Sequence, residues 1–180
     1  AYRFVDFLKE SGARYWQILP LVQTGYGDSP YQSVFASSGN PYFIDLFALA
    51  KEGLLKKSEI APVCGKGKID YGYLYEHKYT VLRRAFARFD VRDEAFERFV
   101  GQGAFEDYAL YMAIKEKNGN KSFDLWPKKY KYRDVAALAA FKEENKSEYL
   151  FWLFVQFIFL RQWHALKDYV NGLGIRIVGD

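Results

Sequence analysis

The chain has little cysteine, little histidine and no long uninterrupted hydrophobic run. Its 180 residues include one cysteine, Cys64, and two histidines, His77 and His164. A single cysteine excludes a disulfide framework and a zinc site of several cysteines, and it fits a reducing compartment, so we expect the cytoplasm. The histidines lack the i, i+4 spacing of a zinc-binding helix. We expect both to be structural or surface residues, with no metal or other cofactor.

The longest hydrophobic stretch, residues 149–160, is too short to cross a membrane. It is interrupted by Gln156, and a membrane span needs about 20 apolar residues. The first residues also lack the pattern of a signal peptide. Half of the residues are hydrophobic and 19% are aromatic, which is enough for a core and excludes intrinsic disorder. We expect a soluble protein without a membrane partner.

The charge balance is slightly basic. Lysine and arginine number 26 against 22 acidic residues, for a net charge of +4, a bias that nucleic-acid-binding proteins share. The basic pairs are separated by acids and aromatics, as at Lys56-Lys57 and Lys128-Lys129. We interpret the charge as dispersed over the solvated surface and expect no nucleic-acid partner. A basic RNA-binding domain is an alternative that no motif supports.

Each end of the chain has the pattern of a helix followed by a short buried strand. Residues 2–11 predict an amphipathic helix, and the apolar residues 15–19 predict a strand. Residues 148–169 predict a long helix that is apolar almost all round, followed by a strand at 175–178. Such strands are typical of a parallel sheet that is buried on both faces. The sequence therefore indicates an internal piece of a parallel α/β fold.

The middle of the chain predicts an inserted subdomain that is mainly helical. About 120 residues separate the two helix–strand pairs, far more than a connecting loop needs. We therefore divide the chain into residues 1–21, 22–145 and 146–180. Helices are predicted at 42–51, after the Asn40-Pro41 cap, at 76–89 and at 135–144. Two more are predicted, one that Asp93 caps and one that carries an apolar stripe over 105–113. Residues 62–73 predict a loop that could hold a short strand.

The segment directly after the first strand carries the chemistry. Residues 24–33 read Thr-Gly-Tyr-Gly-Asp-Ser-Pro-Tyr-Gln-Ser. Tyr26 and Tyr31 offer flat apolar faces, while Asp28 and Ser29 offer hydrogen-bonding groups, a mixture that suits a sugar. Parallel α/β folds bind their ligands at the carboxyl ends of strands. The same composition also fits a rigid turn whose tyrosines merely cover the rim of the sheet, and no phosphate-binding glycine motif is present.

Four stretches carry a resemblance to one enzyme family. The chain closely resembles the 4-alpha-glucanotransferases, or amylomaltases, of glycoside hydrolase family 77 over essentially its whole length, above all at residues 16–21, 24–33, 39–46 and 174–180. The resemblance implies an α/β fold that is part of a (β/α)8 TIM barrel with a large, mainly helical insertion. Residues 1–21 and 146–180 would supply barrel helices with strands two and three, and residues 22–145 the substrate loop and the insertion.

The resemblance also implies a substrate and a set of binding residues. The family transfers alpha-1,4-glucan segments between malto-oligosaccharides with retention of configuration. Tyr26, Asp28, Ser29 and Tyr31 would line the glucan cleft, and Asp180 would support the sugar at the reacting centre. The nucleophile and the acid/base come from later strands in the family, so we expect no catalytic residue in this chain and no activity from the 180 residues alone. A non-catalytic alpha-glucan-binding module is the alternative; nothing indicates an oligomeric state.

Two features qualify the resemblance. Val22-Gln23 stands where the family usually has Gly-Pro, so the entry to the loop is expected to bend differently. In a barrel, the aromatic helix that contains residues 151–159 would be an outer helix, packed against strands two and three and the insertion. In this chain alone we expect part of their surface to be uncovered.

Overall fold

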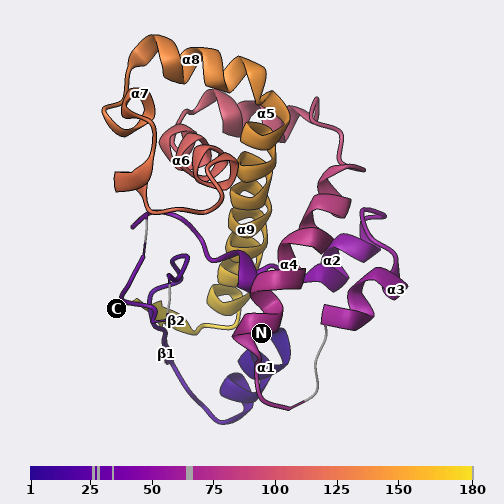
Figure 1. Cartoon of the computed structure of the whole chain (residues 1–180). Helices are drawn as coiled ribbons and strands as arrows, with labels where there is room; N and C mark the ends of the chain where they lie inside the picture. Colours follow the sequence, from indigo (N-terminus) through magenta and orange to yellow (C-terminus); the bar gives the residue numbers. More distant parts are fainter. Residues whose placement is uncertain (26, 28, 34, 64–66, 180) are drawn as a thin grey trace. The chain divides into compact units, whose positions relative to one another are not determined.

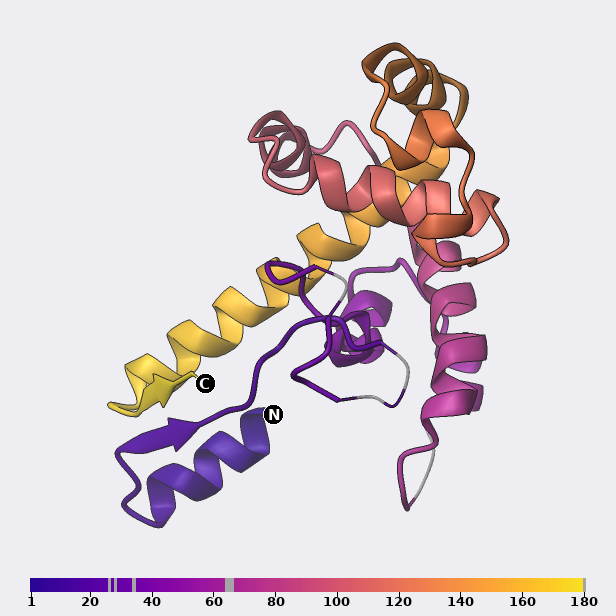
Figure 2. The same ribbon diagram turned by 60° about the vertical axis from the view of Figure 1, so that its left-hand side comes forward.

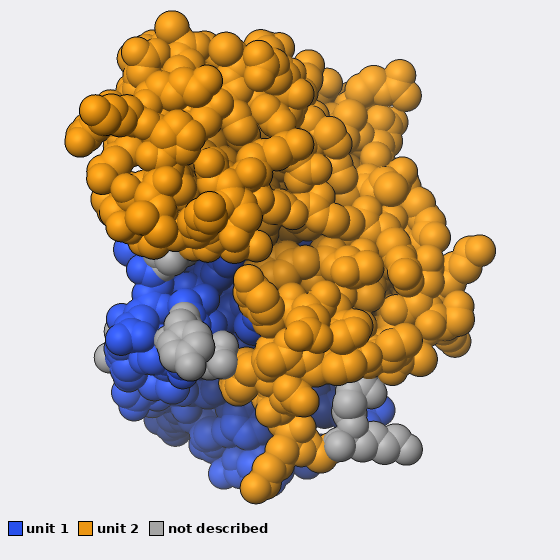
Figure 3. Space-filling model, viewed as in Figure 1, with its two compact units in different colours: residues 1–45, 158–180 blue, residues 46–157 orange. Residues whose placement is uncertain are grey.

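The computed structural model of the chain describes residues 1–25, 27, 29–33, 35–63 and 67–179. The described residues are mainly helical, and their strands form one two-stranded sheet. The chain divides into two compact units, which Figure 3 shows in different colours: residues 1–45 with 158–180, and residues 46–157. No described helix has a stretch long and apolar enough to span a membrane.

The first unit is built on a parallel pair of strands. Helix α1 (Tyr2–Glu10) leads into β1 (Tyr15–Gln17), and α9 (Lys146–Gly172) leads into β2 (Arg176–Val178). The strands lie side by side in Figure 2, with Trp16 opposite Ile177 in a parallel register. The parallel pairing expected from the two apolar strands is confirmed, although both strands are shorter than the apolar runs that predicted them. The expected burial on both faces is wrong for this chain, since Tyr15 is 63% and Val178 42% exposed.

A small hydrophobic core joins the two helices of this unit to the sheet. Its centre consists of Val5 from α1, Val170 from α9 and Ile175 just before β2, all almost fully buried. Partly buried apolar side chains from the same elements pack around it: Leu8, Trp16, Leu166, Leu173 and Ile177. The helices are thereby fixed against the two strands.

Both helix-to-strand corners use the same backbone motif. Gly12 after α1 and Gly174 after α9 have φ angles of 76° and 79°, in the left-handed region. The next residue then donates a hydrogen bond back to the last turn, from Ala13 N to Leu8 O at 2.9 Å and from Ile175 N to Val170 O at 3.2 Å. This is the Schellman ending of a helix, and glycine adopts its left-handed position at low cost. Gly12 and Gly174 therefore end the two helices directly before the strands.

The second unit is helical and surrounds the N-terminal half of α9. In Figure 1, α6 lies beside this half of α9, and α8 leads into its upper end. Ring contacts connect the helices, including Tyr108 with Trp152 and Phe96 with Phe157. The helices are α2 (Leu46–Lys51), α3 (Lys57–Ile60), α4 (Tyr71–Phe86), α5 (Glu94–Gly101), α6 (Glu106–Lys117), α7 (Lys128–Lys131) and α8 (Val135–Glu144), with 3-10 turns at Ala61–Val63 and Phe123–Leu125.

The aromatic face of α9 is covered in this chain, contrary to expectation. Phe151 and Phe154 are fully buried, and Phe157 and Phe159 are less than one tenth exposed. Exposed aromatic side chains lie on other elements, among them Phe7 on α1 (59% exposed) and Tyr75 on α4 (59% exposed). The expectation was wrong because residues of α4, α5 and α6 pack on the aromatic side chains of α9.

Two predicted segments differ from the structure. The helix expected at 42–51 is split into a 3-10 turn at Pro41–Phe43 and α2, with Ile44 extended between them (φ −62°, ψ 123°). The loop expected at 62–73 contains the start of α4, and none of its described residues lies in a strand. There the side chain of Asp70 accepts a hydrogen bond from Tyr73 N at 2.9 Å and caps the helix.

Candidate functional site

The segment after β1 folds back on itself through backbone contacts. Ile18 N donates to Val178 O at 2.9 Å, which prolongs the contact between the strands. Antiparallel bridges then pair Val22 with Gly39 and Thr24 with Ser33. Gly25 N adds a hydrogen bond to Gln32 O at 3.1 Å. The described residues on either side therefore run as two antiparallel arms, and we call residues 18–40 the β1 loop.

Buried polar side chains hold the base of the β1 loop. Asn40 is 5% exposed; its backbone N–H donates to Leu21 O at 2.8 Å, and its Oδ1 accepts from Tyr42 N at 3.0 Å. This confirms Asn40 as the cap before Pro41, now of a 3-10 turn. Ser38 is 2% exposed and donates from Oγ to Phe35 O at 2.9 Å. Buried polar groups are stabilised when such partners replace water.

Helix α9 packs on the returning arm of the β1 loop. Gly39 leaves no room for a side chain, because a Cβ atom there would lie 1.9 Å from the ring of Phe159. Three residues further along α9, the side-chain amide of Gln162 accepts from Asp45 N at 2.7 Å and donates to Asp45 O at 3.1 Å. The long helix therefore fixes the end of the segment that starts at β1.

Two of the five predicted glucan-binding residues lie in the described part of the chain. Tyr31 is 66% exposed. Ser29 is half-buried, and its Oγ accepts a hydrogen bond from Tyr31 N at 3.3 Å. Gly27, between the predicted residues, has a φ of 87°, as expected for a backbone that disfavours a Cβ atom. The other three, Tyr26, Asp28 and Asp180, lie outside the described residues.

The parallel register determines where the β1 loop leaves the sheet. Gln17 pairs with Val178, so the carboxyl ends of both strands are at the same edge. The β1 loop starts at this edge, and so does Gly179 after β2. In parallel α/β folds the carboxyl edge is the ligand-binding edge. The two segments that carry the predicted site residues therefore both begin at one edge of the sheet.

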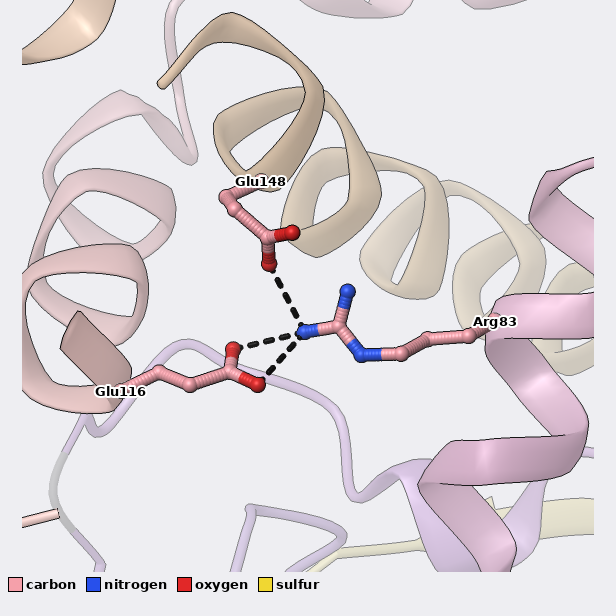
Figure 4. Close-up of polar contacts among 3 residues, drawn as sticks. All are labelled: Arg83, Glu116 and Glu148. Atoms are coloured by element: carbon pink, nitrogen blue, oxygen red, sulfur yellow. Dashed lines mark hydrogen bonds and ion pairs between the residues drawn. The ribbon is translucent and has the colours of Figure 1, made fainter. Parts of the chain in front are cut away.

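One pair of carboxylates in the second unit has an arginine between them. Figure 4 shows Arg83 of α4 between Glu116 of α6 and Glu148 of α9. One guanidinium nitrogen lies 2.6 Å from Glu116 Oε2 and 2.8 Å from Glu148 Oε2. The guanidinium also lies 4.1 Å from the ring centre of Phe151.

This carboxylate pair is structural. A retaining glycosidase places two carboxyl groups about 5 Å apart with the scissile bond between them. At Arg83 the guanidinium occupies that space and binds both carboxylates, so a sugar cannot enter. The three residues join α4, α6 and α9, and we assign them no catalytic role.

The histidines are also placed as structural or surface residues. The ring of His77 stacks on Tyr73 with 3.9 Å between centroids, and its Nδ1 lies 2.9 Å from Tyr73 O. His164 is exposed on α9. In the described ranges no group of three His, Cys, Asp or Glu residues could hold a metal ion. Cys64 lies outside these ranges.

The sequence did not predict which polar side chains hold the β1 loop and the residues after it, because their partners can lie far away in the sequence. Gln162 is 117 positions from its partner Asp45, and no local pattern joins the two. Gln23 is 9% exposed although it stands in the loop entry, where only its departure from the usual Gly-Pro had been noted. Gln162 stands beside Arg161, after the apolar run has ended, so the local sequence carried no signal for its contact.

The chain contains two helix–strand pairs whose strands are parallel, with a loop and helices between them. This arrangement is that of an α/β protein, a class that binds ligands at the carboxyl ends of its strands. The chain belongs to the 4-alpha-glucanotransferase family, glycoside hydrolase family 77, whose family profile matches residues 1–180.

Curated relatives and a solved structure agree with this membership. The 4-alpha-glucanotransferase of Clostridium butyricum is 44% identical over 186 residues, which cover 100% of this chain and 38% of that protein. The enzyme of the same name from Thermus thermophilus is 46% identical over 184 residues, covering 98% and 36%. Amylomaltase from Streptococcus agalactiae, solved in complex with acarbose, superposes with a TM-score of 0.90 at 37% identity, covering 99% of this chain and 38% of that one. This chain thus spans less than two fifths of the length of each.

Proposed function

We propose that this chain is part of a 4-alpha-glucanotransferase that transfers alpha-1,4-glucan segments between malto-oligosaccharides with retention of configuration. Residues 1–21 and 146–180 supply barrel helices with strands two and three of a (β/α)8 barrel. Residues 22–145 supply the substrate loop and the helical insertion. The observation that carries the proposal is the parallel pairing of β1 with β2 in a chain whose whole length matches the family. A single cysteine favours the cytoplasm as its compartment.

The proposed glucan-binding residues are Tyr26, Asp28, Ser29, Tyr31 and Asp180. The exposure of Tyr31 supports this role, since a ring at the loop tip can pack on the apolar face of a glucose unit. Ser29 accepts a hydrogen bond from the backbone of Tyr31, and its hydroxyl proton can still be donated to a sugar. Acarbose, the ligand of the Streptococcus agalactiae enzyme, is an oligosaccharide that such a surface would accept.

The proposed reaction is a double displacement. A carboxylate attacks the anomeric carbon of the donor while a second carboxyl group protonates the leaving oxygen. A sugar hydroxyl then displaces the first carboxylate, and the second takes up its proton. Transfer requires that this hydroxyl outcompete water, and aromatic side chains such as Tyr26 and Tyr31 favour that by excluding water from the cleft. We place both reacting carboxyl groups outside this chain.

Incubation of the full-length protein with maltotriose tests the proposal. We expect glucose together with maltopentaose and longer chains, and proton NMR should show that new linkages keep the alpha configuration. Hydrolysis without chain elongation would contradict a transferase. Binding of acarbose with no turnover would favour the alternative, a non-catalytic alpha-glucan-binding module.

A further inference from the structure

The excess of positive charge lies in one segment of the second unit. Residues 115–134 contain seven basic and three acidic residues, while the remaining nineteen basic residues are matched by nineteen acidic ones. The expectation that the charge is dispersed is therefore wrong for this segment. In Figure 1 it runs from the end of α6 through α7 to the start of α8.

A wide depression of about 680 Å³, open to solvent over most of its extent, lies in this segment; we call it the cavity. Lys117, Lys121 and Lys128 line it, and no acidic residue is among the described residues of its lining. Leu125, Trp126 and Pro127 form an apolar wall, on which Leu125 is 67% exposed. The cavity therefore combines three cations with an apolar surface.

The acidic residues of the segment are occupied elsewhere. Glu116 binds Arg83 at 2.6 Å, and Asp134 caps α8 by accepting from Ala137 N at 2.8 Å. Asp124 accepts a hydrogen bond from the side chain of Ser122, which lowers the pKa of its carboxyl group.

The lysines of the lining are not neutralised by these acids. Within the described ranges no ion pair or hydrogen bond involves the side chains of Lys117, Lys121 or Lys128, although the backbone oxygen of Lys121 accepts from Trp126 Nε1 at 3.1 Å. By contrast, Arg133 of the same segment, which does not line the cavity, binds Asp107 at 2.6 Å. The unneutralised charge thus faces a solvent-filled space.

We propose that this cavity binds a phosphate monoester on a small carrier with an apolar face, such as a sugar phosphate. Ammonium groups form charge-assisted hydrogen bonds with phosphate oxygens, and three of them balance a dianion. The exposed side chain of Leu125, beside Pro127, packs on the apolar face of the carrier. The site shares no residue with the β1 loop and goes beyond the proposed function. A nucleic acid is less favoured because the lysines line one cavity and do not follow a stripe.

Calorimetric titration of the full-length protein tests the site with four probes: glucose 6-phosphate, adenosine monophosphate, inorganic phosphate and glucose. We expect saturable binding of at least one ester that depends on the lysines of the cavity, whereas any binding of glucose, a product of the proposed reaction, should not depend on them. The two esters distinguish a sugar carrier from a nucleoside. Lys121→Gln combined with Lys128→Gln should weaken binding about tenfold, as expected for lost charge-assisted hydrogen bonds. The corresponding arginine variants should retain it.

Lys129→Gln is the matched control, because it removes one charge from the same segment outside the cavity lining. We expect unchanged affinity, with circular dichroism confirming that all variants fold. The proposal is overturned if neither ester binds at millimolar concentration, or if the double glutamine variant binds as well as the wild type. It is also overturned if single-stranded RNA binds more tightly through the same lysines.

Discussion

At the scale of single residues, the β1 loop contains side chains that hold its shape and side chains that face solvent. Asn40 and Ser38 are almost fully buried, and each has a hydrogen-bond partner that offsets the cost of removing a polar group from water. Tyr31 at the tip is two-thirds exposed. The shape of the loop therefore does not depend on the exposed face of the ring that we propose for glucan binding.

Replacement of Tyr31 by alanine tests that role in the full-length enzyme. We expect kcat/KM for maltotriose to fall about tenfold, because the stacking surface for one sugar is lost. Tyr31→Phe keeps the ring and should retain most of the activity. Equal kinetics for the alanine variant and the wild type would show that the ring does not contact substrate.

Gly39→Ala should destabilise the protein. The new Cβ atom would lie 1.9 Å from the ring of Phe159, so the ring or the loop must move, and such overpacking costs about 1–3 kcal/mol. Urea denaturation measures the free energy of unfolding. The control is Gly101→Ala in α5, where a Cβ atom meets nothing within 4 Å; we expect it to be neutral or stabilising. Equal effects of the two substitutions would contradict the close packing.

At the scale of elements, helix caps could be predicted from the local sequence, whereas effects of contacts between distant residues could not. The helix predicted at 135–144 is α8 with the same bounds, and Asp93 caps α5 as expected, accepting from Phe96 N at 2.9 Å. The helix predicted at 42–51 breaks at Asp45, whose backbone N–H and C=O are both bound by Gln162. A local pattern cannot reveal a break that a residue on another helix stabilises.

The start of α4 was missed for a different reason. Gly72 and the tyrosines around it are weak helix formers, and they predicted a loop. The cap at Asp70 and the packing of Val81, Leu82 and Ala85, which are almost fully buried, outweigh this preference. At the start of α4, tertiary packing therefore overrides the low helix propensity of the local sequence.

The ion pair between Glu59 and Arg88 should make stability depend on pH. Arg88 binds both oxygens of Glu59, at 2.7 and 2.8 Å. This hydrogen bonding, together with the backbone N–H of Lys56, lowers the pKa of Glu59 from 4.5 to about 2. Since the folded-state pKa is depressed, the stabilisation is present above pH 4.5 and is lost as pH falls towards 2.

Thermal denaturation of Arg88→Met between pH 7 and pH 2 measures this effect. We expect the variant to melt below the wild type at pH 7 and the difference to shrink under acidic conditions. Arg98→Met, which removes an exposed pair with Glu94 at 3.5 Å, is the control and should have little effect. A melting difference that is the same at all pH values would rule out the pair as its cause.

At the scale of the whole molecule, the chain alone should lack transferase activity. The carboxylates that approach one another at Arg83 are bridged by the guanidinium, so they cannot act as nucleophile and acid/base. We expect the purified 180-residue chain to release no glucose from maltotriose, whereas the full-length protein does. Glucose release by the chain alone would place a reacting carboxyl pair within it.

The fold was more predictable than the site for a physical reason. The parallel strands follow from apolar runs and glycine stops, which are local signals, and β1 and β2 pair as expected. The site combines Tyr31 with a loop base held by Asn40 and Gln162, and the contact of Gln162 follows only from the tertiary fold. Family resemblance supplied the roles of Tyr26, Asp28 and Asp180, which lie outside the described residues and remain predictions.

A crystal structure of the full-length protein with acarbose tests the central claim most directly. The account predicts that the oligosaccharide lies at the carboxyl edge of β1 and β2, with the Tyr31 ring against one sugar and the Asp180 carboxylate bound to the unit at the reacting centre. Acarbose bound away from this edge, with Tyr31 and Asp180 making no contact to it, would contradict the account.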